Sequence, residues 1–186
     1  MSRIAYISGR PGAGKSTLAV PLAAELGYSL VIKDLLKECL HDALSVRGES
    51  DLPWSQRLNI ASWEMLWTVA ARAGDMVIEA NFHSQAADEL DKLRRLGARL
   101  VEVNCACPTE LAQARYNARI RHQAHSVTLP LSAWGKYDGP VGVGPLITVD
   151  TTKPVDIAAV AVEVRRLHAS RDPSSWICGH HGAALI

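Results

Sequence analysis

The chain has 186 residues, of which 48% are hydrophobic and 21% charged. This length supplies one well-filled hydrophobic core and is short for two, so we expect a single domain. Its 20 basic and 19 acidic residues leave a formal net charge of +1, which excludes a general attraction to nucleic acid or to anionic membranes.

The sequence shows neither the basic and then apolar pattern of a secretory leader nor an apolar run long enough to span a membrane. Its four cysteines include no C-x-x-C pair, and we interpret them as buried free thiols of a reducing compartment. We therefore expect a cytoplasmic protein without a membrane partner.

An apolar strand is predicted at 3–8 and a helix at 16–26, with a glycine-rich segment between them. This segment matches the phosphate-binding pattern of two glycines, a lysine and a hydroxyl residue at every fixed position. In such a loop, backbone N–H groups and the positive end of the following helix bind phosphate oxygens. The expected nucleotide-binding residues are Gly9, Arg10, Pro11, Gly12, Ala13, Gly14, Lys15, Ser16 and Thr17.

Two side chains of this loop have more specific expected roles. The ammonium group of Lys15 should reach the β- and γ-phosphates, where its charge assists the transfer of a phosphoryl group. The hydroxyl of Ser16 is the expected protein ligand of a nucleotide-bound Mg²⁺ ion. The loop therefore predicts bound ATP and Mg²⁺, but it does not distinguish a kinase from a hydrolase or a switch.

The second strand, predicted at 29–32, ends at Lys33 and Asp34, just before a helix at 35–44. A carboxylate at the end of a strand beside the nucleotide can accept the proton of an attacking alcohol. Asp34 is therefore the candidate general base and a candidate substrate contact. The alternative is that Asp34 only caps the helix that follows it.

A polar segment at 47–53 precedes a long helix that begins near Pro53 and ends at Gly74. Trp54 lies at the start of this helix, and Trp63 and Trp67 lie one turn apart farther along. These rings either belong to the core or stack on a ligand. We take the segment as a candidate wall of the substrate site, with Trp54 as a substrate contact.

The third strand, at 76–80, ends in a group of polar residues that should face the nucleotide. Glu79 can hold Mg²⁺ through water or orient the second substrate, or it can be a structural partner of Lys15 or Lys33. The expected substrate contacts from this strand end are Glu79, Asn81 and His83.

A helix at 85–96, a strand at 100–105 and a helix at 109–122 follow. Arg115 and Arg119 are four residues apart on the last of these helices, so both guanidinium groups can converge on a transferring phosphoryl group, whereas Arg121 should point elsewhere. The alternative is an ordinary solvated helix face. The polar stretch at 123–145 is rich in glycine and proline, and we expect a lid around 108–145.

A fifth strand at 146–149 and a helix at 155–168 complete a domain predicted over 1–168, with a tail at 169–186. Regular alternation of strands and helices predicts a parallel sheet with helices on both faces. Ligands of such sheets bind at the carboxyl ends of the strands, where the polar residues described above collect.

Four of these segments form a recognisable set: Gly9–Thr17, the Lys33-Asp34 pair with Lys37, Ile78–Phe82, and Arg115 with Arg119. The set resembles the AAA-type small P-loop kinases, the group that includes polynucleotide kinase, zeta-toxin kinases and chloramphenicol phosphotransferase. The resemblance implies a three-layer P-loop NTPase sandwich whose five-stranded parallel sheet has the order 2-3-1-4-5.

The resemblance also implies roles for individual residues. Asp34 would be the general base, Lys37 a substrate or phosphate contact, and Arg115 and Arg119 part of a lid that closes over the nucleotide. The adenine would lie near a short segment after the fifth strand, formed by Asp150, Thr151 and Thr152.

The residues and the resemblance together predict an ATP- and Mg²⁺-dependent kinase that phosphorylates a hydroxyl of a small molecule, such as an antibiotic, a sugar or a nucleoside. Two alternatives stay open: a 5′-hydroxyl polynucleotide or RNA kinase, and a non-catalytic ATP-binding module. We expect no nucleic-acid partner, because no second basic groove is visible. Neither the acceptor nor the oligomeric state is specified by any motif.

Overall fold

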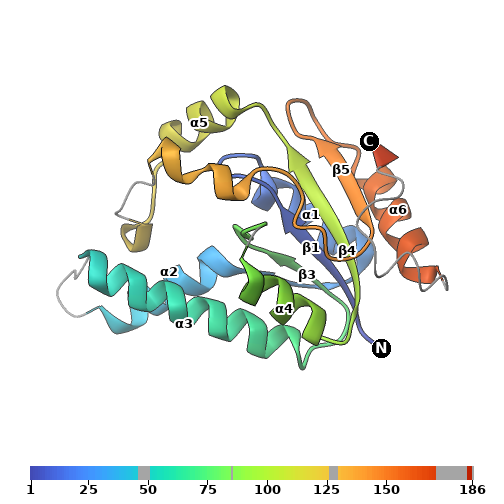
Figure 1. Cartoon of the computed structure of the whole chain (residues 1–186), viewed down its shortest axis with the longest axis horizontal. Coiled ribbons are helices and arrows are strands. Elements are labelled where there is room, and N and C mark those ends of the chain that lie inside the picture. Colours follow the sequence, from blue (N-terminus) through green and yellow to red (C-terminus); the bar gives the residue numbers. More distant parts are fainter. Residues whose placement is uncertain (46–50, 85, 126–129, 171–183, 186) are drawn as a thin grey trace.

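The computed structural model describes residues 1–45, 51–84, 86–125, 130–170 and 184–185, and a six-stranded sheet forms its centre (Figure 1). All neighbouring strands are parallel, in the order β2-β3-β1-β4-β5-β6. The first five confirm the predicted order 2-3-1-4-5, and a short sixth strand lies beyond β5. The strands are β1 (Arg3–Ser8), β2 (Ser29–Ile32), β3 (Met76–Glu79), β4 (Arg99–Ala106), β5 (Leu146–Asp150) and β6 (Ala184–Leu185).

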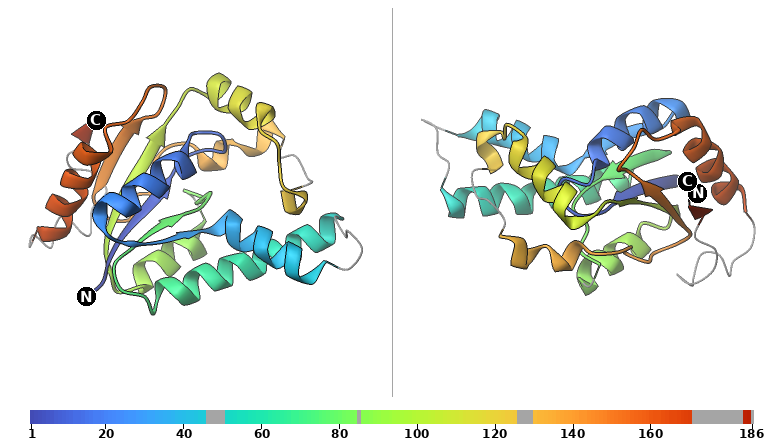
Figure 2. Two further views of the ribbon diagram at one scale, coloured as in Figure 1. Left: turned by 180° about the vertical axis from the view of Figure 1, so that it is seen from behind. Right: turned by 90° about the horizontal axis from the view of Figure 1, so that it is seen from above.

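Helices cover both faces of the sheet, as the alternating pattern predicts (Figure 2). The α-helices are α1 (Lys15–Leu26), α2 (Lys33–Leu44), α3 (Leu52–Ala70), α4 (Ala87–Arg95), α5 (Thr109–Ala118) and α6 (Ile157–Ala169). Three short 3₁₀ helices follow α5, namely η1 (Gln123–His125), η2 (Leu131–Ala133) and η3 (Gly135–Tyr137). None of the helices in the described part of the chain combines the length and hydropathy that a membrane span requires.

The central strand β1 contributes to two hydrophobic cores, because successive side chains of a strand point to opposite faces. Ala5 and Ile7 pack in the core that contains α1 and α6, whereas Ile4 and Tyr6 pack in the core that contains α3 and α4. All four residues are fully buried. Burial on both faces explains why the strand has an apolar sequence rather than an alternating one.

Two of the sequence-based expectations on secondary structure need correction. Helix α5 ends at Ala118 rather than at residue 122, and Arg119 already has an extended backbone with φ −83° and ψ 138°. The polar stretch at 123–145, for which a loop or the continuation of a lid was predicted, contains the three 3₁₀ helices. The first difference matters for the site, because it changes the directions in which Arg119 and Arg121 leave the chain.

The cysteines only partly follow the expected burial. Cys105 is buried and Cys107 is half-buried, but Cys39 is exposed on α2, so the expectation of burial is wrong for Cys39. Burial raises the pKa of Cys105 to about 12, which keeps this thiol protonated. Cys178 lies outside the described residues.

A fully buried carboxylate, that of Glu102 on β4, ties the sheet to the segment before β5. Glu102 accepts hydrogen bonds from the backbone N–H groups of Val141 at 2.7 Å and Gly142 at 2.8 Å. It also accepts from the hydroxyls of Ser8 and, at 2.9 Å, Tyr6. Because the donors come from both β1 and the segment, Glu102 fixes the path of the chain over this face of the sheet.

We expect Glu102→Gln to lower the free energy of unfolding by about 2–4 kcal/mol, because an amide keeps one acceptor oxygen and turns an NH₂ group toward buried donors. Urea unfolding would measure this change. The matched control is Glu64→Gln, which removes an exposed carboxylate on α3 and should change the stability by less than about 0.5 kcal/mol. An equally small effect at Glu102 would show that the buried bonds contribute little.

Candidate active site

The phosphate-binding loop connects β1 to α1, and its shape depends on glycine. Gly9, Gly12 and Gly14 have φ values of 128°, 79° and 86°, in the left-handed region that other residues rarely adopt. A Cβ atom at Gly12 would lie only 2.1 Å from the carbonyl oxygen of Ala112 in α5. Gly12 therefore permits both the turn of the loop and the close approach of α5.

The two key side chains of the loop are held by the end of β3. The Lys15 ammonium donates to Asn81 Oδ1 at 2.7 Å and to the Arg10 carbonyl at 3.0 Å. The Ser16 hydroxyl donates to Glu79 Oε2 at 2.8 Å. The sequence suggested Lys15 or Lys33 as a structural partner of Glu79. In the described part of the chain neither lysine forms an ion pair with Glu79, whose hydrogen-bond partner is Ser16.

Burial shifts the ionisation of both charged groups at this strand end. It lowers the pKa of Lys15 and raises the pKa of Glu79, while the attraction between the two charges opposes each shift. The Ser16 hydroxyl and the Glu79 carboxylate are hard oxygen donors next to each other, which is the chemistry that Mg²⁺ prefers. The residues present therefore fit a nucleotide-bound Mg²⁺ ion.

Two adjoining cavities open at the carboxyl ends of the strands. The smaller, of about 210 Å³, contains the phosphate loop with Lys15, Ser16 and Glu79, and we call it the phosphate cavity. The larger, of about 470 Å³, lies between α2, α3 and the segment after α5, and we call it the acceptor cavity. The residues that line both are Pro11, Asp34, Asn81, Tyr116 and Arg119.

Asp34 lies in the first turn of α2 and is the one carboxylate that lines both cavities among the described residues. The N-cap of α2 is Ile32, with no side-chain hydrogen bond, so Asp34 is not the helix cap. Its Oδ1 pairs with Lys33 Nζ at 2.9 Å. Burial alone would raise the pKa of Asp34, but the charge and hydrogen bond of Lys33 outweigh it and hold the pKa below its usual value.

Both lysines of α2 that line the acceptor cavity are buried. Lys33 donates to Asn59 Oδ1 at 2.8 Å in addition to its pair with Asp34. Lys37 donates to Ser55 Oγ at 2.8 Å. Burial, followed by the charge of Lys33, lowers the pKa of Lys37 to about 8. The predicted substrate contact Lys37 is therefore placed in this cavity.

The predicted arginines reach the phosphate cavity from different backbone positions. Arg115 lies on α5 and donates to the carbonyl of Thr151 at 3.0 Å, whereas Arg119 follows the end of the helix. Both line the phosphate cavity, although the two residues do not share a helical face as predicted. Arg121, expected to point elsewhere, does not line the phosphate cavity. It lines the acceptor cavity instead, and its guanidinium lies 3.7 Å from the centre of the Tyr116 ring.

A third cavity, of about 440 Å³, lies beyond the phosphate loop. Gly14, Thr17, Arg115 and Thr151 line it, as does the apolar stretch after β5. Of the three residues expected near adenine, only Thr151 lines this cavity. Asp150 and Thr152 do not line it and are hydrogen-bonded to each other. Asp150 Oδ1 accepts from the backbone N–H of Thr152 at 2.9 Å and from the Thr152 hydroxyl at 2.6 Å.

The remaining substrate contacts that the sequence predicted have different outcomes. His83 and Asn81 line the acceptor cavity. Trp54 lines neither cavity: its indole N–H donates to Ser45 Oγ at 2.9 Å, and its ring lies against Arg57. The aromatic side chain of α3 in the cavity wall is instead Trp63, which lies nine residues, or about two and a half turns, farther along the helix.

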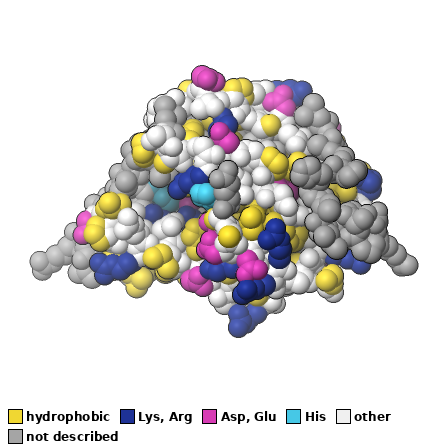
Figure 3. Space-filling view, in the orientation of Figure 1, with side chains coloured by type: hydrophobic (Ala, Val, Ile, Leu, Met, Phe, Trp, Pro, Cys, Tyr) yellow, Lys and Arg dark blue, Asp and Glu magenta, His cyan; other side chains and the backbone are white. Residues whose placement is uncertain are grey.

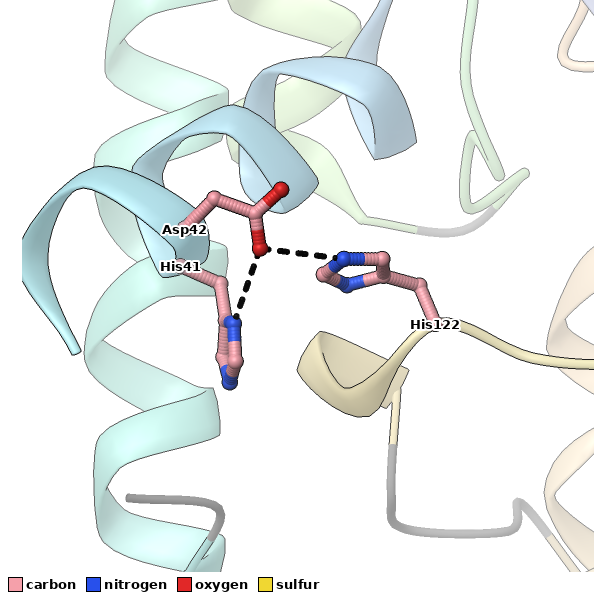
Figure 4. A group of neighbouring side chains, drawn as sticks. All are labelled: His41, Asp42 and His122. Atoms are coloured by element: carbon pink, nitrogen blue, oxygen red, sulfur yellow. Dashed lines mark hydrogen bonds and ion pairs between the residues drawn. The ribbon is translucent and has the colours of Figure 1, made fainter. Parts of the chain in front are cut away.

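Two histidine–carboxylate pairs join the segment after α5 to α2. His122 Nε2 lies 3.1 Å from Asp42 Oδ1, and His125 Nε2 lies 3.0 Å from Glu38 Oε1. His41 Nδ1 approaches the same Asp42 oxygen at 3.4 Å (Figure 4). Ser55, the hydrogen-bond partner of Lys37, donates to the Ala124 carbonyl of η1, so η1 lies close to Lys37, and His125 of η1 lines the acceptor cavity.

The three groups in Figure 4 each offer one ligand atom, and these atoms lie within 4.8 Å of one another. His122 Nδ1 accepts the N–H of Ala124 at 3.2 Å, so the ring proton of His122 lies on Nε2 and faces Asp42. A metal-bound histidine usually donates from its other ring nitrogen. The arrangement is therefore that of a hydrogen-bonded pair rather than of a metal centre.

Several residues of the acceptor cavity could not be identified from the sequence. His125, Lys136 and Tyr137 come from the stretch rich in glycine and proline, where no periodic pattern indicates direction. Arg121 was set aside because the helix was expected to continue past it. A signal was available only for Trp63, whose spacing to Trp67 placed both rings on one helix face.

Comparisons with known proteins agree with the observed fold. A family model described as an AAA domain matches residues 4–139. A search of curated proteins gave no match. The crystal structure of a candidate kinase from Chloroflexus aurantiacus J-10-fl is similar over 89% of this chain and 98% of its own length, with 27% identity and a TM-score of 0.76.

Two more distant structures share the fold alone. The APS kinase of Mycobacterium tuberculosis, in complex with AMPPNP and APS, is 22% identical over 91% of this chain and 98% of its own, with a TM-score of 0.57. The shikimate kinase of Acinetobacter baumannii, in complex with shikimate, is 18% identical over 90% of this chain and 93% of its own, with a TM-score of 0.57. By its family match, its sheet order and its phosphate loop, the chain belongs to the AAA domain family and has the P-loop fold of small kinases.

Proposed function

We propose that the protein is a kinase that transfers the γ-phosphoryl group of ATP to a hydroxyl group of a small molecule, with Asp34 as the general base. The observation that carries the proposal is the position of Asp34, the carboxylate that lines both cavities in the described structure. A donor in one cavity and an alcohol in the other would meet at this side chain.

The phosphate cavity would hold the donor. Backbone N–H groups of the loop and the first turn of α1 would bind the phosphates of ATP, and the cavity beside Thr151 would take the adenine. Ser16 and Glu79 would hold Mg²⁺, directly or through water, and the bound ion supplies positive charge to the β- and γ-phosphates. Lys15 would turn from Asn81 to the phosphates, and Arg115 and Arg119, which line the same cavity, would add further positive charge.

The acceptor cavity would hold the alcohol. Asp34 is ionised at neutral pH because its pKa lies below the usual value, so its carboxylate can accept the proton as the hydroxyl oxygen bonds to phosphorus. Lys33 positions this carboxylate, since it binds both Asp34 and Asn59 of α3. The leaving oxygen stays on ADP, and the charge that develops around the phosphoryl group faces Lys15 and the two arginines.

We further propose that the segment around 108–145 is a lid. It supplies residues to both cavities, among them Arg115, Tyr116 and Arg119. It also carries Lys136 and Tyr137 at the acceptor side. Closure of one segment over donor and acceptor together would exclude water from the phosphoryl group and so favour transfer over hydrolysis.

The general base can be tested by Asp34→Asn, which keeps the shape of the side chain and removes its ability to accept the proton. Turnover should fall by about 100-fold or more while ATP binding is retained, as expected for the loss of a general base. The assay is the ATP-dependent mass gain of alcohols in a screened panel. Asp91→Asn, an exposed change on α4, is the control and should keep full activity.

Full turnover of the Asp34→Asn variant would refute the assignment of the base. Transfer of phosphate to an oligonucleotide 5′ end, with a steep dependence on salt, would replace the small-molecule acceptor by the polynucleotide alternative. Binding of ATP without transfer to any acceptor would favour the non-catalytic module.

The pH dependence tests the role of Lys33. In Lys33→Met the burial of Asp34 remains but the charge and hydrogen bond that oppose it are lost, so the pKa of Asp34 should rise. Activity requires the ionised carboxylate and is lost as the pH falls through this pKa. Between about pH 7 and about pH 5, the variant should therefore lose a larger fraction of its rate than the wild type.

The matched control for this profile is Lys92→Met, which removes an exposed lysine paired with Glu64. Its profile should overlay that of the wild type. Coincident profiles for Lys33→Met and the wild type would mean that Lys33 does not set the ionisation of the base.

A further inference from the structure

Lys37 is a buried cation without a counter-ion. Only 7% of its surface is exposed, and its ammonium donates to the hydroxyl of Ser55, which in turn donates to the carbonyl of Ala124 in η1 at 3.1 Å. Within the described part of the chain Lys37 forms no ion pair. Lysines are almost never buried to this degree unless they are paired, so the position calls for an anionic ligand.

The charged groups around Lys37 do not neutralise it. On its own helix, Asp34 is paired with Lys33, and its attraction to Lys37 is weaker than the repulsion of Lys37 by Lys33. From η1, His125 faces the same region and is paired with Glu38. The side chain that α3 offers to Lys37, Ser55, is neutral.

The wall of the acceptor cavity has the same excess of positive charge. Its basic residues are Lys33, Lys37, Arg119, Arg121 and Lys136, whereas its carboxylates are Asp34 and Glu89. Basic side chains and a histidine gather on the face of the molecule where the loop after β3 meets the segment that contains η3 (Figure 3). An acceptor with a negative charge would be attracted to this wall.

We propose that the acceptor is an alcohol that also carries an anionic group, a carboxylate or a phosphate ester, and that Lys37 binds this group while the hydroxyl lies at Asp34. The inference rests on the proposed function, because it takes the larger cavity as the acceptor site. Both roles fall on one helix, since Asp34 and Lys37 lie one turn apart on α2 and line the same cavity.

Lys37 is not part of the donor site. The phosphate cavity is lined by Lys15, Arg115 and Arg119, but not by Lys37. The γ-phosphate of the donor therefore does not supply the missing counter-ion. The anion must enter from the acceptor side.

The geometry favours a small molecule over a nucleic-acid strand. Lys37 is 7% exposed, donates to Ser55, which bonds to η1, and lines a cavity of about 470 Å³, so an anion bound to it would have to fit within that cavity. Proteins that bind single strands instead present an open basic groove with stacking platforms along the backbone. A metabolite-sized hydroxy acid or phosphorylated alcohol fits the observed site.

The test uses alcohols in matched pairs that differ in one charged group: sorbitol with gluconate, and glycerol with glycerate or glycerol 3-phosphate. Each is incubated with ATP, Mg²⁺ and the full-length protein, and mass gain is followed. We expect the anionic member to have a kcat/KM about 10- to 100-fold above that of its neutral partner, the range of a charge-assisted hydrogen bond. Lys37→Met should abolish this preference, mainly by raising KM.

Binding is measured separately by calorimetry, with the donor site saturated by AMPPNP and Mg²⁺ so that the phosphate loop is blocked. The anionic members should bind to the wild type and to Lys92→Met, the exposed-lysine control, but bind at least about 10-fold more weakly to Lys37→Met. Thermal unfolding checks that Lys37→Met is folded. Its Tm should equal or exceed that of the wild type, because an unpaired buried charge has been removed.

Proton uptake provides a readout that a structural role for Lys37 would not produce. Burial lowers the pKa of Lys37 to about 8, so about half of the Lys37 side chains are uncharged at about pH 8. A bound anion that raises this pKa back toward its usual value should therefore cause the uptake of at most about half a proton per site. Calorimetry in two buffers of different ionisation enthalpy measures this uptake. His125, whose pKa lies below its usual value, stays neutral at that pH and does not contribute.

The outcomes separate this inference from the proposed function. If anionic members bind through Lys37 with proton uptake but nothing is phosphorylated, the anion site stands and the kinase proposal fails. If neutral alcohols are phosphorylated as well as or better than their anionic partners, or Lys37→Met affects both equally, the anion site is refuted while the kinase stands. An oligonucleotide as the only acceptor, or no anion binding at all, also refutes it.

Discussion

The parallel direction of the strands is the constraint on which the site depends. Because the five neighbouring strands from β2 to β5 run the same way, their carboxyl ends meet at one edge of the sheet. The loop after β1, Asp34 after β2, and Glu79 with Asn81 at the end of β3 are brought together in this way. These side chains are far apart in the sequence, and the sheet alone makes them neighbours.

The same constraint explains how much could be predicted from the sequence. Apolar strands, a glycine-rich loop and the polar residues at strand ends are local patterns, so the sheet, the loop and the place of Asp34 at this edge of the sheet could be predicted. The acceptor cavity depends instead on tertiary contacts. Where α5 stops decides the direction of Arg121, and Trp63 rather than Trp54 faces the cavity because of how α3 packs. The periodicity of a sequence does not predict such tertiary contacts.

Two buried lysines of α2, Lys33 and Lys37, lie one turn apart but differ in whether a carboxylate neutralises their charge. Lys33 is paired with a carboxylate and a side-chain amide, and it keeps the adjacent carboxyl group ionised. Lys37, one turn along, has a hydroxyl partner and has lost much of its preference for the charged form. The first stabilises a charge that the fold already contains, and the second leaves room for one that a ligand would supply.

The contact between Gly12 and α5 fixes how closely the phosphate-binding loop and this helix approach each other. With a left-handed glycine against the carbonyl of Ala112, the loop and the helix touch backbone to backbone, and even one methyl group would act as a wedge between them. The phosphate-binding loop and α5, which both line the phosphate cavity, therefore meet at this contact without space between them. If α5 moves, a rotation about this contact would preserve it whereas sliding would break it, and a rotation would displace Arg119, which follows the end of the helix, more than Ala112.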